Sequence, residues 1–155
     1  MKTVGFCLIN NVPQHDEEAL FAAVKAFHAL PLEAKSLLSP AHFITGNRNL
    51  FHGYFPFLDN DPSHKEFYDM GRPLSDISEW ERQGCALYEN SPFVTDSELY
   101  EESSKSLGED PNKFQWIFDT FERQFKLMHK LSLQLISCLA LGLGKRADYF
   151  DSWFK

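Results

Sequence analysis

The sequence predicts an α+β fold that is mainly helical and contains a few short strands. Apolar residues recur at helical spacing near the N-terminus and again, over a longer stretch, in residues 112–142. Residues 4–9 form a short apolar run, and residues 64–71 alternate around aromatic side chains, which is typical of strands. The chain has 155 residues, of which 43% are hydrophobic, and this is enough to bury a core. We therefore expect one domain over residues 1–155.

A strand over residues 4–9 and a helix over residues 13–30 are the first predicted elements. The run "VGFCLI" is apolar throughout, which indicates a buried strand that is covered on both faces. In the helix, Leu20 and Phe27 return on the same face. Pro13 suits the first helical position, and the acidic residues that follow it oppose the positive end of the helix dipole.

The first helix is expected to stop at a corner formed by Leu30 and Pro31. A proline ring cannot sit inside a helix without a cost of roughly 3 kcal/mol, and it pushes the preceding residue out of the helical region. The same ring suits the start of a new helix. We therefore predict a second, short helix over residues 32–38 at a new angle.

The middle of the chain is predicted to be largely irregular. Residues 41–63 are aromatic and interrupted by glycine and proline, which indicates a wall or a binding loop. A short strand is expected within residues 64–71. Residues 72–112 are polar and are expected to hold at most short helices, for instance over residues 96–106.

One long helix is predicted over residues 112–142. It should end at Gly142 to Gly144, because glycine readily adopts the left-handed conformation that closes a helix. Its apolar face repeats at spacings of three, four or seven residues and includes Phe114, Phe118, Phe121, Phe125, Met128, Leu135 and Leu139.

Charge and cysteine content exclude several classes of function. A formal net charge of −7 argues against a nucleic-acid partner, because such binding depends on cations that neutralise phosphates. Cys7, Cys85 and Cys138 are odd in number and far apart, so neither a disulfide framework nor a zinc site is predicted. The N-terminus lacks the features of a secretory signal, and no apolar stretch is long enough to cross a membrane. We expect a cytoplasmic protein with no membrane partner.

The histidines allow one metal hypothesis. A non-haem iron site can be built from a histidine and a carboxylate two residues apart on a strand, with a second histidine from elsewhere. The pairs His15 with Glu17 and His64 with Glu66 have this spacing, and His129 could complete a site with His64 and Glu66. In a helix start, however, residues two apart diverge. The alternative is that His64 and Glu66 are solvated and that His129 lies on a helix surface.

Phe51, His52 and Tyr54 are the candidate substrate-binding residues. With Phe55 and Phe57 they combine apolar faces with polar tips, which is usual in the lining of small-molecule pockets. The alternative is that these side chains form core beneath a loop. A nucleophile with its base and a glycine-rich phosphate loop are both missing from the sequence.

Five strings of the sequence resemble the N-terminal region of the isopenicillin N synthase-like family of 2-oxoglutarate/Fe(II)-dependent dioxygenases. They occur in the family's order and spacing and cover nearly the whole chain. The helix, the Leu-Pro corner and the Glu-x-Lys sequence that follows it are characteristic. The strings are "GFCLINNVPQ", "AAVKAFHALPLEAK", "HGYFPF", "KEFYDMG" and "LISCLALGLGKRADYFDSWF".

The resemblance implies a fold and a set of cofactors for a longer protein. Members of the family fold as a double-stranded β-helix, or jelly roll, with N-terminal helices packed outside it. Their iron is held by a His-x-Asp pair and a distant histidine, and 2-oxoglutarate by Arg-x-Ser. All of these would lie beyond Lys155. Fe(II) and 2-oxoglutarate are thus implied for the full-length family, and neither is expected to bind this chain.

The resemblance also implies a function. We expect the N-terminal segment of a dioxygenase-like oxidoreductase that acts on a small organic substrate and is not catalytic on its own. The chain departs from the family at residues 10–12, where Asn-His-Gly is usual, and at His52, where arginine is common. The alternative is a non-catalytic interaction module that docks its apolar helical face on another chain or on a second copy of itself.

Overall fold

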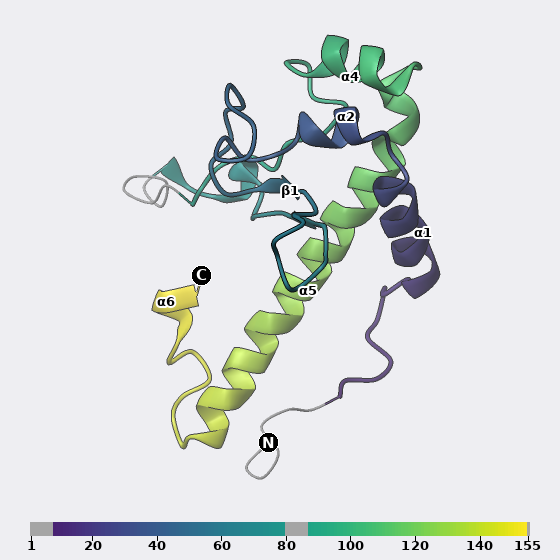
Figure 1. The fold of residues 1–155 in the computed structure, drawn as a ribbon. Coiled ribbons are helices and arrows are strands. Elements are labelled where there is room, and N and C mark those ends of the chain that lie inside the picture. The colour runs from purple at the N-terminus through teal and green to yellow at the C-terminus, as the bar shows by residue number, and fades with distance from the viewer. Residues whose placement is uncertain (1–7, 80–86, 155) are drawn as a thin grey trace. The chain divides into compact units, whose positions relative to one another are not determined.

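The computed structural model describes residues 8–79 and 87–154 and shows an α+β chain in which helices predominate (Figure 1). The chain forms two compact units, one of residues 1–23 and 119–155 and one of residues 24–118. The described elements are, in order, α1 (Glu17–His28), α2 (Leu32–Ser36), β1 (Gly53–Phe55), β2 (Phe67–Asp69), the 3-10 helix η1 (Leu74–Asp76), α4 (Tyr100–Leu107), the 3-10 helix η2 (Pro111–Phe114), α5 (Gln115–Gly142) and α6 (Asp151–Phe154).

Helix α1 begins later than the sequence predicts. Pro13 and Gln14 form a turn in which Gln14 has a φ of 65°, and the helix starts at Glu17. The carboxylate of Asp16 accepts a hydrogen bond of 2.9 Å from the backbone N–H of Ala19. This is the bond that an N-cap residue makes. The prediction that Pro13 opens the helix is therefore wrong, because Asp16 supplies the stronger start signal.

The predicted N-terminal strand over residues 4–9 is not present in the two of its residues that the structure describes. Residues 4–7 lie outside the described residues. The last two positions, Leu8 and Ile9, are irregular and have 86% and 42% of their surface exposed. These two residues are thus not part of a buried strand.

The corner at Leu30 and Pro31 is confirmed. Helix α1 ends at His28, Pro31 is extended with φ −52° and ψ 142°, and α2 follows at once. The carbonyl of Pro31 accepts the first backbone bond of α2, from Lys35, at 3.1 Å. The residues that the corner turns inward, Leu30, Ala34 and Leu38, are buried, so the corner serves to pack both helices into one core.

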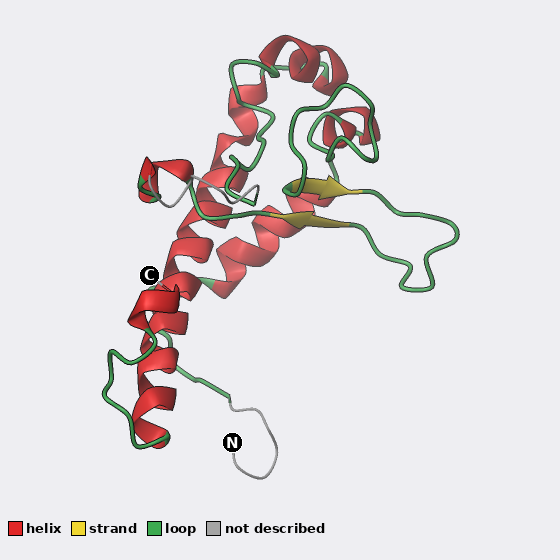
Figure 2. Cartoon of the chain, turned by 90° about the vertical axis from the view of Figure 1, so that its left-hand side faces the viewer, coloured by secondary structure: helices red, strands yellow, loops and turns green. Residues whose placement is uncertain are grey.

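The predicted strand within residues 64–71 is present as β2. It pairs antiparallel with β1, which arises in a segment that the sequence indicated to be irregular. Figure 2 shows the two strands side by side. In their register Tyr54 pairs with Tyr68 and Phe55 with Phe67. The rings of Phe55 and Phe67 stack with centroids 4.4 Å apart, and such cross-strand aromatic pairs stabilise a short sheet.

The core of the unit formed by residues 24–118 centres on Phe27. This side chain is fully buried, and its ring lies 5.0 Å from the ring of Tyr68, 6.2 Å from Tyr54 and 6.3 Å from Phe118. Tyr54 and Phe118 are themselves buried. The hairpin, the end of α1 and the start of α5 are thus held by aromatic edge and face contacts. Beside this core, α2 packs against α4.

The long predicted helix is confirmed as η2 followed by α5, and its end lies at the predicted glycines. Gly144 has a φ of 71°, and the N–H of Lys145 bonds back to the carbonyl of Ala140 at 2.9 Å. Its last turn is only partly buried, since Ala140 is fully buried whereas Leu139 and Leu141 are 45% and 60% exposed. Helix α6, which follows, is absent from the sequence prediction.

Candidate functional site

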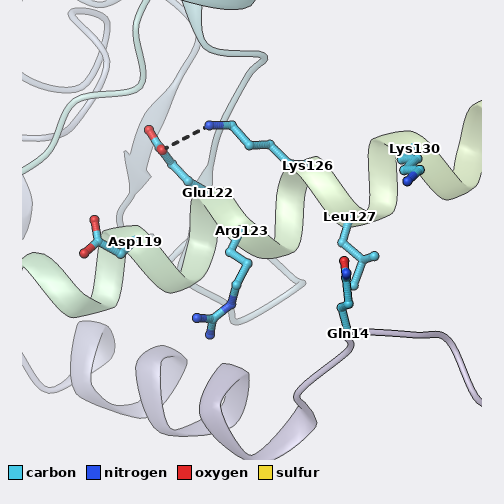
Figure 3. A pocket seen from close by; sticks show the side chains of 7 residues that line it. All are labelled: Gln14, Asp119, Glu122, Arg123, Lys126, Leu127 and Lys130. Atoms are coloured by element: carbon cyan, nitrogen blue, oxygen red, sulfur yellow. Dashed lines mark ion pairs between the residues drawn. The ribbon is translucent and has the colours of Figure 1, made fainter.

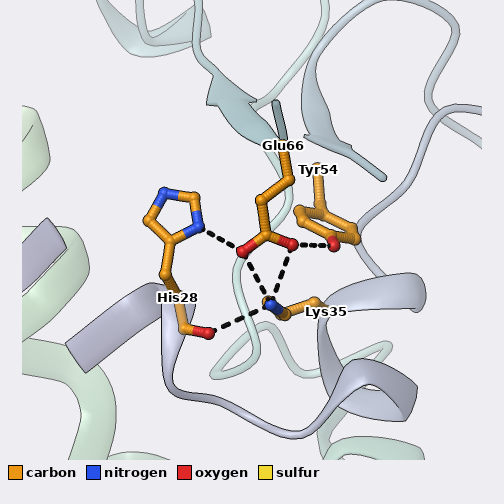
Figure 4. A network of polar contacts seen from close by, with 4 residues as sticks. All are labelled: His28, Lys35, Tyr54 and Glu66. Atoms are coloured by element: carbon orange, nitrogen blue, oxygen red, sulfur yellow. Dashed lines mark hydrogen bonds and ion pairs between the residues drawn. The ribbon is translucent and has the colours of Figure 1, made fainter. Parts of the chain in front are cut away.

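Three side chains from three parts of the chain meet at the carboxylate of Glu66 (Figure 4). Glu66 lies one residue before β2, and its donors are His28 at the end of α1, Lys35 in α2 and Tyr54 in β1. The Nδ1 of His28 lies 2.6 Å from Oε1, and the Nζ of Lys35 lies 3.0 and 3.1 Å from the two oxygens. The hydroxyl of Tyr54 donates to Oε2.

Lys35 is the most deeply buried charge of this network. Its side chain is only 7% exposed, and Nζ also donates to the carbonyl of His28 at 3.1 Å. The ammonium thus has a partner for each of its three hydrogens. A charge this buried is tolerated only when it is paired and hydrogen-bonded, and Glu66 provides that pairing.

The network also sets the pKa values of its members. Partial burial acts to raise the pKa of Glu66, but the hydrogen bonds from Tyr54, His28 and Lys35 outweigh it and hold the pKa at about 2. Burial, followed by the hydrogen bond to Glu66, raises the pKa of Tyr54 above its usual range. A general base works best with a pKa near the operating pH. The low pKa of Glu66 therefore indicates a structural role.

This arrangement argues against the iron hypothesis built on His64 and Glu66. Both oxygens of Glu66 already accept hydrogen bonds, while the ring of His64 stacks on Phe57 with centroids 5.8 Å apart. His129 lies in α5, where its ring stacks on Phe125. Within residues 8–79 and 87–154, no group of three His, Cys, Asp or Glu side chains could hold a metal ion.

The loop before β1 is held by a second carboxylate. The backbone N–H of Leu50 donates to one oxygen of Glu89 at 2.7 Å, and those of Phe51 and His52 donate to the other at 2.6 and 2.7 Å. The Nε2 of His52 also lies 3.1 Å from the carbonyl of Leu87. Three consecutive amides thus converge on one carboxylate, a contact that sequence reasoning missed because Glu89 carries no local signal for it.

The three predicted substrate-binding residues differ in their surroundings. Tyr54 is 1% exposed and belongs to the core and to the Glu66 network. Phe51 is 39% exposed, and His52 is half-buried against Gly71. Only Phe51 and His52 therefore lie where a ligand could reach them, beside the amides that bind Glu89.

A separate hollow of about 670 Å³ lies along α5 in the other unit (Figure 3). Charged side chains of α5 line much of it, and Glu122 pairs with Lys126, one helical turn further along α5, at 3.7 Å. The two acidic side chains of its lining precede the three basic ones along α5, so the hollow carries both charges. The residues that line it are Gln14, Asp119, Glu122, Arg123, Lys126, Leu127 and Lys130.

The remaining predictions from the sequence concern His15, the cysteines and membrane-spanning helices. His15 precedes α1 and pairs with the side chain of Gln124 at 3.1 Å. Cys138 is exposed and free, whereas Cys7 and Cys85 lie outside the described residues. In the part of the chain that the structure describes, no helix is both long and apolar enough to cross a membrane.

Comparison of the chain with family models, with curated proteins and with solved structures found no match.

Proposed function

We propose that this chain is the N-terminal segment of a 2-oxoglutarate/Fe(II)-dependent dioxygenase-like oxidoreductase that acts on a small organic substrate. In this role it supports a catalytic barrel and adds a wall near the substrate, and it is not catalytic by itself. Phe51 and His52 are the residues that would face the substrate.

The Glu66 network is the observation that carries this proposal. Its four members come from three of the strings on which the resemblance rests: "AAVKAFHALPLEAK" supplies His28 and Lys35, "HGYFPF" supplies Tyr54 and "KEFYDMG" supplies Glu66. These side chains bond to one another within the unit of residues 24–118. The strings are therefore joined physically, as expected if they were the shared framework of one structural layer.

The residues present do not fit the iron of this family. The described residues lack a group of three metal-ligating side chains, and Glu66 is fully engaged by its donors. We propose that the chemistry on the substrate is carried out by a catalytic part of a longer protein. What the chain itself supplies is the buried corner of α1 and α2, the hairpin, and the loop of residues 50–52.

The first test is the transcript sequence across the codon for Lys155. We expect the reading frame to continue into a His-x-Asp pair, a distant histidine and an Arg-x-Ser. The isolated chain, supplied with Fe(II), 2-oxoglutarate and O2, should form no succinate. A stop codon directly after Lys155, or succinate formation that is lost in His129→Ala, would contradict the proposal.

A second candidate function is an interaction module, and the C-terminal residues favour it. Leu141 at the end of α5 is 60% exposed, Leu143 is 67% exposed, and Trp153 in α6 is 69% exposed. A contiguous exposed apolar patch marks a surface that binds another chain, and we propose that these side chains belong to one. If this surface is an interface, the sedimentation coefficient of the chain should rise with concentration, and Leu141→Glu should abolish that rise. Trp116→Glu, which alters an exposed apolar residue at the other end of α5, is the control.

A further inference from the structure

The loop of residues 50–52 has the chemistry of an anion-binding cradle. Its three consecutive backbone N–H groups all donate to the carboxylate of Glu89, at 2.6 to 2.7 Å. Hydrogen bonds from amides to a charged acceptor are shorter and stronger than those between neutral groups. Successive amides that point to one centre form the kind of concavity that binds anions in many proteins.

Nothing in the cradle is specific to a glutamate side chain. Every recognised atom of Glu89 is a carboxylate oxygen, and the donors are backbone groups that any carboxylate of similar reach could satisfy. Glu89 reaches the cradle only because the tertiary structure brings the two segments together, since 37 to 39 residues separate it from its donors. An external carboxylate would therefore compete with it for the same three bonds.

The surroundings of the cradle are apolar and accessible. Leu50 and Phe51 each contribute a backbone N–H group to the cradle, and these residues are 52% and 39% exposed. Leu87, on the segment that carries Glu89, is 55% exposed. An apolar body attached to the bound carboxylate would cover these side chains and gain the free energy of removing them from water.

His52 adds an unsatisfied polar atom at the same place. Its Nδ1 is buried and has no hydrogen-bond partner, although its Nε2 lies against the carbonyl of Leu87. Buried polar atoms without partners are uncommon in folded proteins, and each calls for a water, an ion or a functional role to account for it. This atom belongs to the residue whose N–H closes the cradle.

We infer that the backbone amides of Leu50, Phe51 and His52 form a binding site for a small carboxylate with an apolar body, and that Glu89 occupies this site in the free chain. This inference deepens the proposed role of the loop in substrate binding. It rests on that proposed function only where it identifies the bound carboxylate with the substrate of the oxygenase. Binding itself follows from the cradle.

The test is a titration of the ¹⁵N-labelled chain with hexanoate, followed through its backbone amide NMR signals. In Glu89→Ala the signals of residues 50–52 should shift. In the unaltered chain hexanoate should bind about tenfold more weakly, because Glu89 competes for hydrogen bonds to a charged group. Glu98→Ala, which removes the carboxylate paired with Arg48, is the matched control and should bind as the unaltered chain does.

Two further probes separate the charge from the apolar body. Hexanol has the same chain without the charge, and acetate has the charge without the chain. We expect hexanol to leave the amides of residues 50–52 unshifted and acetate to bind more weakly than hexanoate. Equal shifts with hexanol and hexanoate, or equal affinities for acetate and hexanoate, would overturn the inference.

If Glu89→Ala does not fold, a second variant tests the same inference. Glu89→Gln keeps the side-chain shape and removes the charge, and it should also bind hexanoate more tightly than the unaltered chain. A folded Glu89 variant whose residues 50–52 do not respond to hexanoate would show that the cradle binds only its own glutamate. These readouts do not depend on activity, so their failure is distinct from the failure of the transcript test.

Discussion

The hydroxyl of Tyr54 donates a hydrogen bond to the carboxylate of Glu66, and it does so from a side chain that is 1% exposed. The bond joins β1 to the residue before β2 at one end of the hairpin. It also places Glu66 where His28 and Lys35 reach it from the two helices of the corner. A single carboxylate thus ties the corner to the hairpin.

Replacing Tyr54 with phenylalanine should destabilise the chain by about 1 to 2 kcal/mol, because it removes one donor from a charged acceptor and keeps the ring. Urea denaturation followed by circular dichroism measures the change. In a double-mutant cycle with Glu66→Gln the two effects should be less than additive, since the two residues share one bond. Strict additivity would show that the Tyr54 hydroxyl contributes independently of Glu66.

The contribution of Glu66 to stability should depend on pH. Its pKa falls from about 4.5 in an unfolded chain to about 2 in the folded one, so the folded state favours the charged form. The stabilisation is complete above the unfolded pKa and is lost as the pH falls toward the folded pKa. We expect Glu66→Gln to cost about 2 kcal/mol near neutral pH, a value reduced for the partial exposure of Glu66.

The measurement for this second prediction is the difference in free energy of unfolding between the unaltered chain and Glu66→Gln, taken from about pH 7 to about pH 2. The difference should shrink as the pH is lowered. A difference that stays constant over this range would mean that the charge of Glu66 does not contribute. Asp61→Asn is the control. The pKa of Asp61 is also lowered, but by hydrogen bonds from Ser63 in the same turn and not by distant parts of the chain.

Gly53→Ala should destabilise the hairpin severely. Gly53 has a φ of 123°, and an added Cβ would lie 1.9 Å from the carbonyl oxygen of Leu38, which accepts a backbone bond from Tyr54. We expect a loss of about 3 kcal/mol or more, from backbone strain and from the clash together. Thermal unfolding followed by circular dichroism would detect it.

Gly108→Ala is the control that measures the cost of backbone strain without a clash. Gly108 has a φ of 70°, but a Cβ there would meet nothing within 4 Å, so the loss should be about 1 kcal/mol. If both variants lose the same stability, the close approach of Leu38 does not matter.

Removing the cap of α1 should also destabilise the chain. Asp16→Ala leaves the N–H of Ala19 without its side-chain acceptor, and we expect a loss of about 1 kcal/mol. Asp16→Ser restores an acceptor and should recover most of it. Both are read from denaturant unfolding, and equal losses in the two variants would exclude a capping role.

Much of the fold could be predicted because its signals are local. Pro31 alone is enough to break α1 from α2, and the glycines at 142 and 144 are enough to end α5. The start of α1 could not be placed as easily, because Pro13 and Asp16 are competing signals and only the backbone shows which one prevails. The strand β1 was missed since three residues, "GYF", form a strand only when β2 lies beside them.

The candidate site could be predicted only in part. The aromatic run indicated that residues 51–54 matter, but it did not distinguish Phe51, which is exposed, from Tyr54, which is core. Burial depends on what packs against a side chain, and Tyr54 packs against Phe27, which lies in α1. For the same reason the sequence around Lys35 carries no signal that its side chain is buried against Glu66.

The sequence by itself determined the helical layer: an apolar face in α1, a proline corner, and a long helix closed by glycine. These follow from the spacing of neighbours along the chain and from the conformations that proline and glycine allow. The tertiary structure alone decided which charges are buried and which carboxylate each donor meets. Glu66 lies 38 residues from His28 and 31 from Lys35, and Glu89 lies 37 from His52, so no local pattern could join them.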